Sequence, residues 1–222
     1  MDIGVFGGTF NPIHLGHLRV AEEVREALGL GRVVFVPAKI PPHKSQAAIA
    51  RPEARLKMVT RAVADNPYFE ASELELRREG PSYSIDTLTE IREGLGPGER
   101  LWFLMGTDAF REIHTWHRFS EIFALADIAV MRRPPGGEEL APPASLAAEF
   151  TPSEAGFRHA SGREVRMVPV TLLDISSTHI RQALADGRSV RYLVPEAVLA
   201  LLGPARFGDP ARKGDHGSRS DP

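Results

Sequence analysis

Short apolar runs alternate with helical patterns along most of the chain, and this alternation restricts the possible folds more than any other feature. The runs of strand length are residues 2–6, 32–37, 101–105, 128–131 and 164–170. The segments with helical spacing or capping signals are residues 18–28, 52–64, 84–94, 177–185 and 195–202, with Ser84 as the candidate N-cap of the third. Strands separated by helices predict βαβ units with right-handed crossovers. We therefore expect an α/β fold, a Rossmann-like, doubly wound, mostly parallel sheet with helices on both faces.

The length of 222 residues fits one domain. We expect residues 1–202 to form that domain, with 177–202 as its C-terminal helical part. Residues 203–222 contain no aliphatic side chain larger than Ala, which predicts a disordered tail. Residues 132–143 carry four prolines and two glycines and are expected to be a loop, as are residues 41–49.

Charge and cysteine content exclude several classes of protein. Lys and Arg number 27 against 29 Asp and Glu, a net charge of −2, which argues against nucleic-acid and anionic-membrane binding. Cysteine is absent, so disulfide scaffolds, thiolate zinc sites and cysteine nucleophiles are excluded. No apolar run approaches the ~18 residues that a membrane span needs. The N-terminus lacks the basic and apolar regions of a signal peptide, so a cytoplasmic protein is expected.

The first string with chemical content is GGTFNPIHLGH at residues 7–17, between the first strand and the first helix. Gly7 and Gly8 allow close approach to a phosphate, and a helix N-terminus offers free N–H donors. His14 and His17 could donate to the same phosphate oxygens. The string is neither the G-x-G-x-x-G fingerprint nor a P-loop. A zinc site would need more ligands than two histidines, and a glycine turn beside two ordinary histidines is the plain alternative.

The second string is DISSTHIR at residues 174–181, where a helix is expected to begin. Ser and Thr at such a position commonly cap the helix. Hydroxyl and N–H groups there can also hold an anion, with Arg181 one turn further on as a charged clamp. Taken alone, the string favours capping.

Together, GGTFNPIHLGH and ISSTHIR resemble the paired signatures of the nucleotidyltransferase superfamily with the HxGH motif, and within it the bacterial nicotinate-nucleotide adenylyltransferases. The resemblance spans about residues 1–202 in the family's order. It is strengthened by PPHK at 41–44, SYS at 82–84, DTL at 86–88, GTD at 106–108 and TW at 115–116. Three positions depart from the family's usual residues: Asn11 stands for Asp, Ser84 for Thr and His117 for Tyr.

The resemblance implies adenylyl transfer from ATP to nicotinate mononucleotide, giving deamido-NAD and pyrophosphate in NAD biosynthesis. The transfer would be an in-line attack without a covalent intermediate, driven by positioning and charge stabilisation. Mg²⁺ would enter as MgATP, with no metal ligands from protein side chains. Small-molecule substrates are thus the expected partners, with neither nucleic acid nor membrane.

The resemblance also implies roles for individual residues. His14 and His17 would donate to the α-phosphate, and Lys44 and Arg181 would neutralise phosphate charge. The residues expected to bind ATP are Gly7, Gly8, Thr9, Phe10, His14, His17, Gly106, Asp108, Ile175, Ser177, Thr178 and Arg181. Those expected to bind nicotinate mononucleotide are Asn11, Lys44, Tyr83, Ser84, Trp116 and His117.

Three other functions compete with this interpretation. A phosphopantetheine adenylyltransferase shares the ATP chemistry, but it is usually much shorter and its acceptor pocket lacks the PPHK and TW segments. An enzyme that prefers nicotinamide mononucleotide would use the same residues. A nucleotide-sensing module on the same fold would be free to lose His14, His17, Lys44 and Arg181, yet all four are present.

Overall fold

The computed structural model of the protein describes residues 1–41, 49–132 and 141–202. The expected tail at 203–222 lies outside the described residues. So does most of each expected loop, including Lys44 of the PPHK segment.

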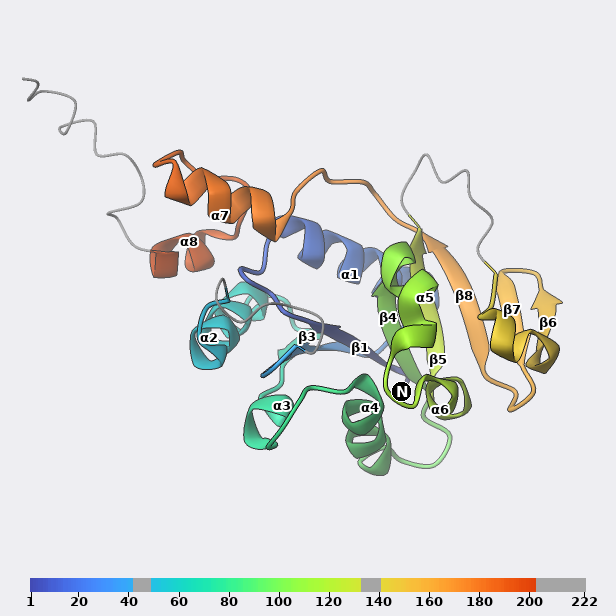
Figure 1. The fold of residues 1–222 in the computed structure, drawn as a ribbon. Coiled ribbons are helices and arrows are strands. Elements are labelled where there is room, and N and C mark those ends of the chain that lie inside the picture. Colours follow the sequence, from blue (N-terminus) through green and yellow to red (C-terminus); the bar gives the residue numbers. More distant parts are fainter. Residues whose placement is uncertain (42–48, 133–140, 203–222) are drawn as a thin grey trace, which may run out of the picture.

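One eight-stranded sheet runs through the molecule in the order β3-β2-β1-β4-β5-β8-β7-β6 (Figure 1). The strands are β1 (Ile3–Gly8), β2 (Arg32–Pro37), β3 (Phe69–Ala71), β4 (Leu101–Gly106), β5 (Asp127–Arg132), β6 (Phe150–Ser153), β7 (Gly156–His159) and β8 (Glu164–Pro169). All neighbours from β3 to β8 pair in parallel, and β7 and β6 extend the sheet in antiparallel fashion. The strand order reverses between β1 and β4, and ligands of doubly wound sheets bind at that point, beyond the carboxyl ends of the strands.

Helices cover both faces of the sheet. They are α1 (Leu15–Leu28), α2 (Pro52–Val63), α3 (Leu74–Arg77), α4 (Ser84–Glu93), α5 (Thr107–Glu112), α6 (Phe119–Leu125), α7 (Ser177–Ala185) and α8 (Glu196–Leu202), with 3₁₀ turns at Ile113–Thr115 and Ala144–Glu149. Figure 1 shows α7 and α8 beside α1 and α2, with α4 and α6 on the other side of the sheet. The expected fold class is therefore confirmed.

The period of two along each central strand divides the core into two layers. Val5 of β1 and Phe103 of β4 point into the layer that also buries Leu88 of α4. Phe6 and Leu104, one residue along each strand, point into the layer that buries helices α1, α2, α7 and α8. Strands that are apolar on both faces need such cover on both sides, and this explains why their sequences read as continuous apolar runs.

Several elements were not predicted, and one cap was predicted wrongly. The missed elements are short: β3, β6, β7, α3, α5 and α6. Ser84 was expected to cap its helix, but it is the first helical residue and Tyr83 occupies the N-cap position. The reason is that the Tyr83 carbonyl already accepts the Thr87 N–H, so the helix starts one residue earlier.

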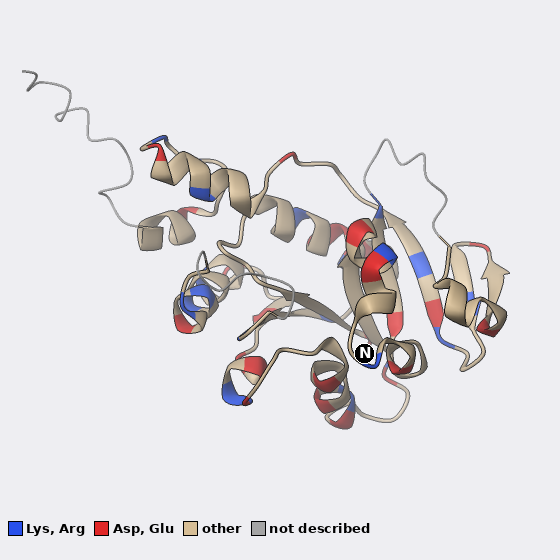
Figure 2. Ribbon diagram, viewed as in Figure 1, with Lys and Arg blue, Asp and Glu red and all other residues tan. Residues whose placement is uncertain are grey.

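A buried ionic cluster fastens the amino-terminal ends of β5 and β8. Asp127 is 0% exposed and accepts two hydrogen bonds from the Arg100 guanidinium, at 3.1 and 2.7 Å. It also accepts the Glu164 N–H at 2.8 Å. Figure 2 shows acidic and basic bands close together on these strands.

Among the described residues, no helix has the length and apolar character that crossing a membrane requires.

We expect Asp127→Ala to lower the free energy of unfolding by about 3 kcal/mol, because the Arg100 guanidinium loses two hydrogen bonds and the Glu164 N–H loses its acceptor. The value lies at the low end for a buried pair, since Arg100 is 37% exposed. Urea unfolding followed by circular dichroism measures it. Glu121→Ala, which removes an exposed ion pair with Arg118, is the control and should leave the midpoint unchanged. An unchanged midpoint for Asp127→Ala would show that the cluster contributes no stability.

Candidate active site

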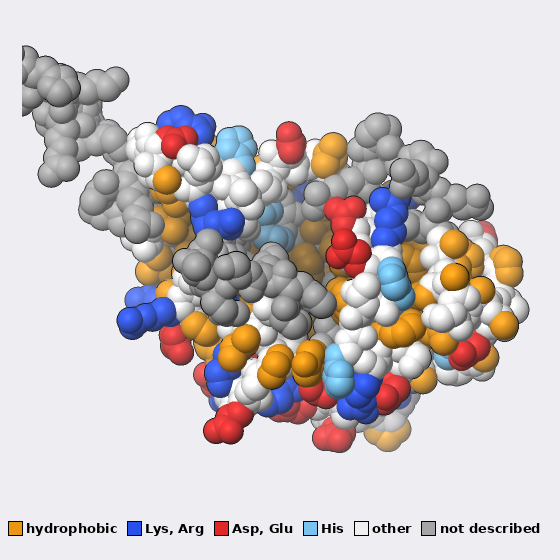
Figure 3. Space-filling view, viewed as in Figure 1, with side chains coloured by type: hydrophobic (Ala, Val, Ile, Leu, Met, Phe, Trp, Pro, Cys, Tyr) orange, Lys and Arg blue, Asp and Glu red, His pale blue; other side chains and the backbone are white. Residues whose placement is uncertain are grey.

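A cavity of about 310 Å³ lies beside the carboxyl end of β1, at the reversal of strand order. Its size suits a small-molecule ligand. Figure 3 looks onto this face, where the surface is hollowed between the α7 side and the α5 side. The residues that line the cavity are Gly7, Gly8, Thr9, Ala38, Pro41, Glu75, Ser82, Tyr83, Ser84, Phe103, Ala109, Trp116 and His117.

The glycine pair at the end of β1 makes room for an aromatic ring as well as for a ligand. A Cβ on Gly8 would lie 3.0 Å from the Phe10 ring, whereas one on Gly7 would meet only Phe103, at an ordinary 3.7 Å. Phe10 has a φ of 45°, which is unusual for an aromatic residue, and it is 3% exposed. The turn therefore folds the Phe10 ring back into the core, so only the backbone of Phe10 is left for the contact with ATP that the sequence predicted.

The two histidines form a stacked pair at the start of α1. Their ring centroids lie 3.6 Å apart. The backbone N–H of His14 donates to Nδ1 of His17 at 3.3 Å. A neutral imidazole with Nδ1 as acceptor carries its hydrogen on Nε2, so His17 presents an Nε2–H donor. Gly16 leaves room for the His14 ring, because a Cβ there would approach Nδ1 of His14 to 3.0 Å and would press on it.

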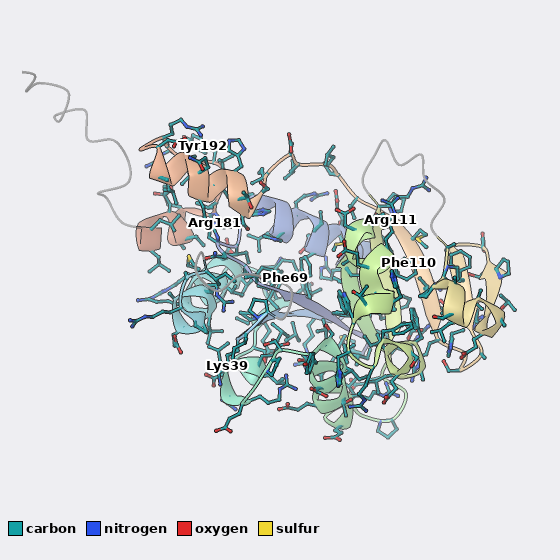
Figure 4. The ribbon with its side chains drawn as sticks, in the orientation of Figure 1. Lys39, Phe69, Phe110, Arg111, Arg181 and Tyr192 are labelled. Atoms are coloured by element: carbon teal, nitrogen blue, oxygen red, sulfur yellow. The ribbon has the colours of Figure 1, made fainter. Side chains whose placement is uncertain are left out.

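Helix α7 is bound directly to the loop that leads to these histidines. The Ser177 hydroxyl donates to the Pro12 carbonyl at 2.8 Å, and Arg181 donates to the Asn11 carbonyl at 2.9 Å. Ser176 caps the helix by accepting the His179 N–H. The structure thus brings the two motifs of the sequence together. In Figure 4, Arg181 on α7 and Arg111 on α5 lie on either side of the end of β1.

An aromatic wall closes the other side of the cavity. The Tyr83 and His117 rings stack with centroids 4.2 Å apart. Trp116 is half-buried and packs edge-on against Phe103, with centroids 6.2 Å apart. Trp116 is therefore both a core residue and a lining residue, and Ser84 lines the same wall.

The other residues predicted to bind substrates differ in how far their side chains are exposed. Asn11 is buried, and its Oδ1 accepts the Ala50 N–H at 3.2 Å, so its side chain supports the loop. Ile175 is half-buried against the core beside α1. Asp108 is 99% exposed at the start of α5, and a Cβ on Gly106 would meet no atom within 4 Å. No group of three or more His, Asp or Glu side chains within the described segments could hold a metal ion.

A buried arginine that was not predicted supports the chain just beyond the carboxyl ends of β1 and β2. Arg55 is 0% exposed and donates to the carbonyls of Thr9 at 2.8 Å, Lys39 at 3.2 Å and Ala50 at 2.9 Å. Burial lowers the pKa of its guanidinium, and the nearby Glu53 and Glu75 carboxylates oppose that shift. Arg55 lies on the apolar stripe of α2 with Met58, which is the signal that could have revealed it.

Comparison with known proteins agrees with this geometry. Residues 5–183 match the family model described as cytidylyltransferase-like. The chain is 48% identical over 206 residues to the "Probable nicotinate-nucleotide adenylyltransferase" of Trichlorobacter lovleyi, covering 91% of this chain and 96% of the relative. The chain belongs to the nicotinate-nucleotide adenylyltransferase family. The relative of the same description from Halorhodospira halophila is also 48% identical, over 88% of this chain and 90% of its own.

The fold of this adenylyltransferase family member also matches solved structures. The Plasmodium falciparum nicotinic acid mononucleotide adenylyltransferase complexed with NaAD superposes with a TM-score of 0.68 at 16% identity. The match covers 90% of this chain and 94% of that one. At this identity the likeness supports the fold alone.

Arg55→Met is expected to lower the free energy of unfolding on the order of 3 kcal/mol, because three part-buried carbonyls lose a charged donor. Hydrogen exchange of the Ala50 amide should accelerate as well. Arg61→Met, on the exposed side of the same helix, is the matched control and should stay within about 0.5 kcal/mol. Equal effects of the two substitutions would contradict a supporting role for Arg55.

Proposed function

We propose that the protein transfers the adenylyl group of ATP to nicotinate mononucleotide, forming deamido-NAD and pyrophosphate. The observation that carries the proposal is that one stretch of chain, residues 7–17, serves two sites. Its first residues line the aromatic cavity, and its last residues hold the histidine pair beside α7. A pyridine ring fits the aromatic wall, and phosphates fit the histidine side.

In the proposed reaction, a 5′-phosphate oxygen of nicotinate mononucleotide bonds to the α-phosphorus of ATP as the bond to the bridging oxygen breaks. Pyrophosphate leaves with the Mg²⁺ that ATP brought. His17 donates through Nε2–H to the α-phosphate, and His14 assists it from the stacked ring. Such preorganised donors stabilise charge where it develops in the transition state.

Arg181 and Lys44 are proposed to neutralise the phosphates. The Ser177 hydroxyl already donates to the Pro12 carbonyl. Ser177 is therefore proposed to bind a phosphate through its backbone N–H. Thr178 Oγ1 accepts from Arg181 at 3.2 Å and keeps its own hydrogen for the phosphates. Asp108 is proposed to accept from the ATP ribose, in the space that Gly106 leaves open.

On the acceptor side, Trp116 is proposed to stack on the pyridine ring. Tyr83, Ser84 and His117 line the same pocket, and the Tyr83–His117 stack must part or shift if the ring is to enter between them. The cytoplasmic location expected from the sequence stays a prediction.

The acceptor is tested by incubating the protein with MgATP and, in parallel, nicotinate mononucleotide, nicotinamide mononucleotide or phosphopantetheine. We expect pyrophosphate release with the nicotinate compound and deamido-NAD as the product. Comparable release with both pyridine nucleotides would remove the acid preference. Release with phosphopantetheine alone would favour the rival acceptor, and ATP binding without any release would favour a nucleotide sensor.

His17→Ala is expected to lower kcat by about 10²–10³, because one preorganised donor to the transferred phosphate is lost. His114→Ala is the control, since His114 is exposed and its ring contacts the Arg111 carbonyl. Steady-state kinetics with saturating MgATP measures both. Wild-type kcat in the His17 variant would remove the histidine from the proposed mechanism.

A further inference from the structure

The cavity wall contains a buried carboxylate to which the proposed mechanism gives no role. Glu75 of α3 is 7% exposed and lines the cavity. Its Oε1 accepts a hydrogen bond from the Thr87 hydroxyl at 2.6 Å. Its Oε2 is buried with no hydrogen-bond partner in the part of the chain that the structure describes. Such an oxygen is costly to bury, and its place in the wall points to a partner that the cavity binds.

The neighbours of Glu75 hold its carboxylate in place. Thr87 is 3% exposed, and its hydroxyl also accepts from the Arg78 guanidinium at 2.7 Å. The buried Arg55 guanidinium attracts the same carboxylate. Because Oε1 is fixed by Thr87, Oε2 is the atom left to meet a ligand.

The chemistry of the carboxylate restricts what it can bind. An ionised carboxylate oxygen accepts hydrogen bonds and donates none. On nicotinate mononucleotide the phosphate and the ring carboxylate are acceptors too, and the two ribose hydroxyls are the donors. A ring carboxylate next to Glu75 would be repelled, whereas a ribose hydroxyl would be bound by a charge-assisted hydrogen bond.

The position of Glu75 agrees with a ribose contact. The aromatic wall of Tyr83, Trp116 and His117 suits the pyridine ring. Arg55, which attracts Glu75, donates to the carbonyl of Thr9, and this loop continues to the histidine pair. The ribose joins the ring to the phosphate, so it belongs between these two regions.

We propose that Glu75 accepts a hydrogen bond from a ribose hydroxyl of the acceptor nucleotide and so sets affinity for nicotinate mononucleotide. The inference rests on the proposed function. Glu75 is a binding residue that does not touch the reacting phosphorus. It should therefore act on KM for the acceptor and leave kcat and the KM for ATP nearly unchanged.

Glu75→Gln is the direct variant, because the amide oxygen can still accept from Thr87. We expect KM for nicotinate mononucleotide to rise about tenfold or more, with kcat and the KM for ATP within about twofold of wild type. Glu73→Gln is the matched control: Glu73 immediately precedes the same short helix but pairs with Arg77 at the surface. It should change none of the three constants.

Substrates that lack one hydroxyl separate direct contact from a structural effect. With one of the two compounds, 2′-deoxy or 3′-deoxy nicotinate mononucleotide, the kcat/KM of the wild type should fall about tenfold. Glu75→Gln should lose less than about threefold with the same compound. The inference would be overturned if Glu75→Gln still lost about tenfold in kcat/KM with the deoxy compound. It would also be overturned if Glu75→Gln lowered kcat/KM only with nicotinamide mononucleotide, because that result would point to a contact with the ring amide.

Thr87→Val preserves the size of the side chain but removes the hydroxyl that donates to Oε1 of Glu75. This variant tests whether Glu75 acts only through packing. Under a purely structural role, both variants would lower Tm alike and raise both KM values, with deoxy discrimination intact. That result would also overturn the inference. If the wild type itself forms no deamido-NAD, the proposed function fails. An active wild type with an unaffected Glu75 variant refutes Glu75 alone.

Discussion

Two hydrogen bonds from α7 to the backbone of the loop between β1 and α1 hold the candidate site together. The Ser177 hydroxyl and the Arg181 guanidinium reach the carbonyls of Pro12 and Asn11, across more than 160 residues of sequence. In the sequence, every strand from β2 to β8 lies between the two segments that these contacts join. The histidine pair, the start of α1 and the start of α7 therefore take their places as one unit. Arg181 thus has two duties, since the guanidinium proposed to meet phosphate also binds the loop.

Buried charge supports this arrangement from behind. Arg55 satisfies three carbonyls on Thr9, Lys39 and Ala50, which come from three separate stretches of backbone. A water molecule or an apolar side chain could not replace a planar group with five donors. The cost of burying the guanidinium is offset by these bonds and by the nearby carboxylates. Glu75 is one of those carboxylates, so the support of the loop and the proposed ribose contact share one electrostatic network.

The sequence predicted the elements whose pattern is local. The run at 32–37 and the helix at 177–185 match the structure at both ends, because β-branched runs and capped amphipathic segments need no tertiary information. Strand β3 has three residues, and β6 contains Pro152; neither carries a clear period of two. Helices α5 and α6 have six and seven residues, too few for a reliable apolar stripe.

The site was predictable to the extent that its residues lie in strings. The glycine turn, the histidines and Arg181 were found in this way, as were Tyr83 and Trp116. Their chemical roles stay predictions. Glu75 and the loop contact of Ser177 could not be found, because burial and a carbonyl partner arise only when distant segments meet. Arg55 interrupts an apolar stripe, and a charged residue at such a position is a signal worth following.

In the proposed reaction the adenylyl group passes directly from ATP to the acceptor, while the protein's residues only position the substrates and stabilise charge. The most direct test uses ATP with a sulfur of known configuration at the α-phosphorus, followed by ³¹P NMR of the dinucleotide product. A single in-line displacement predicts inversion at phosphorus. Retention would require two displacements through a covalent enzyme intermediate and would rule out direct transfer.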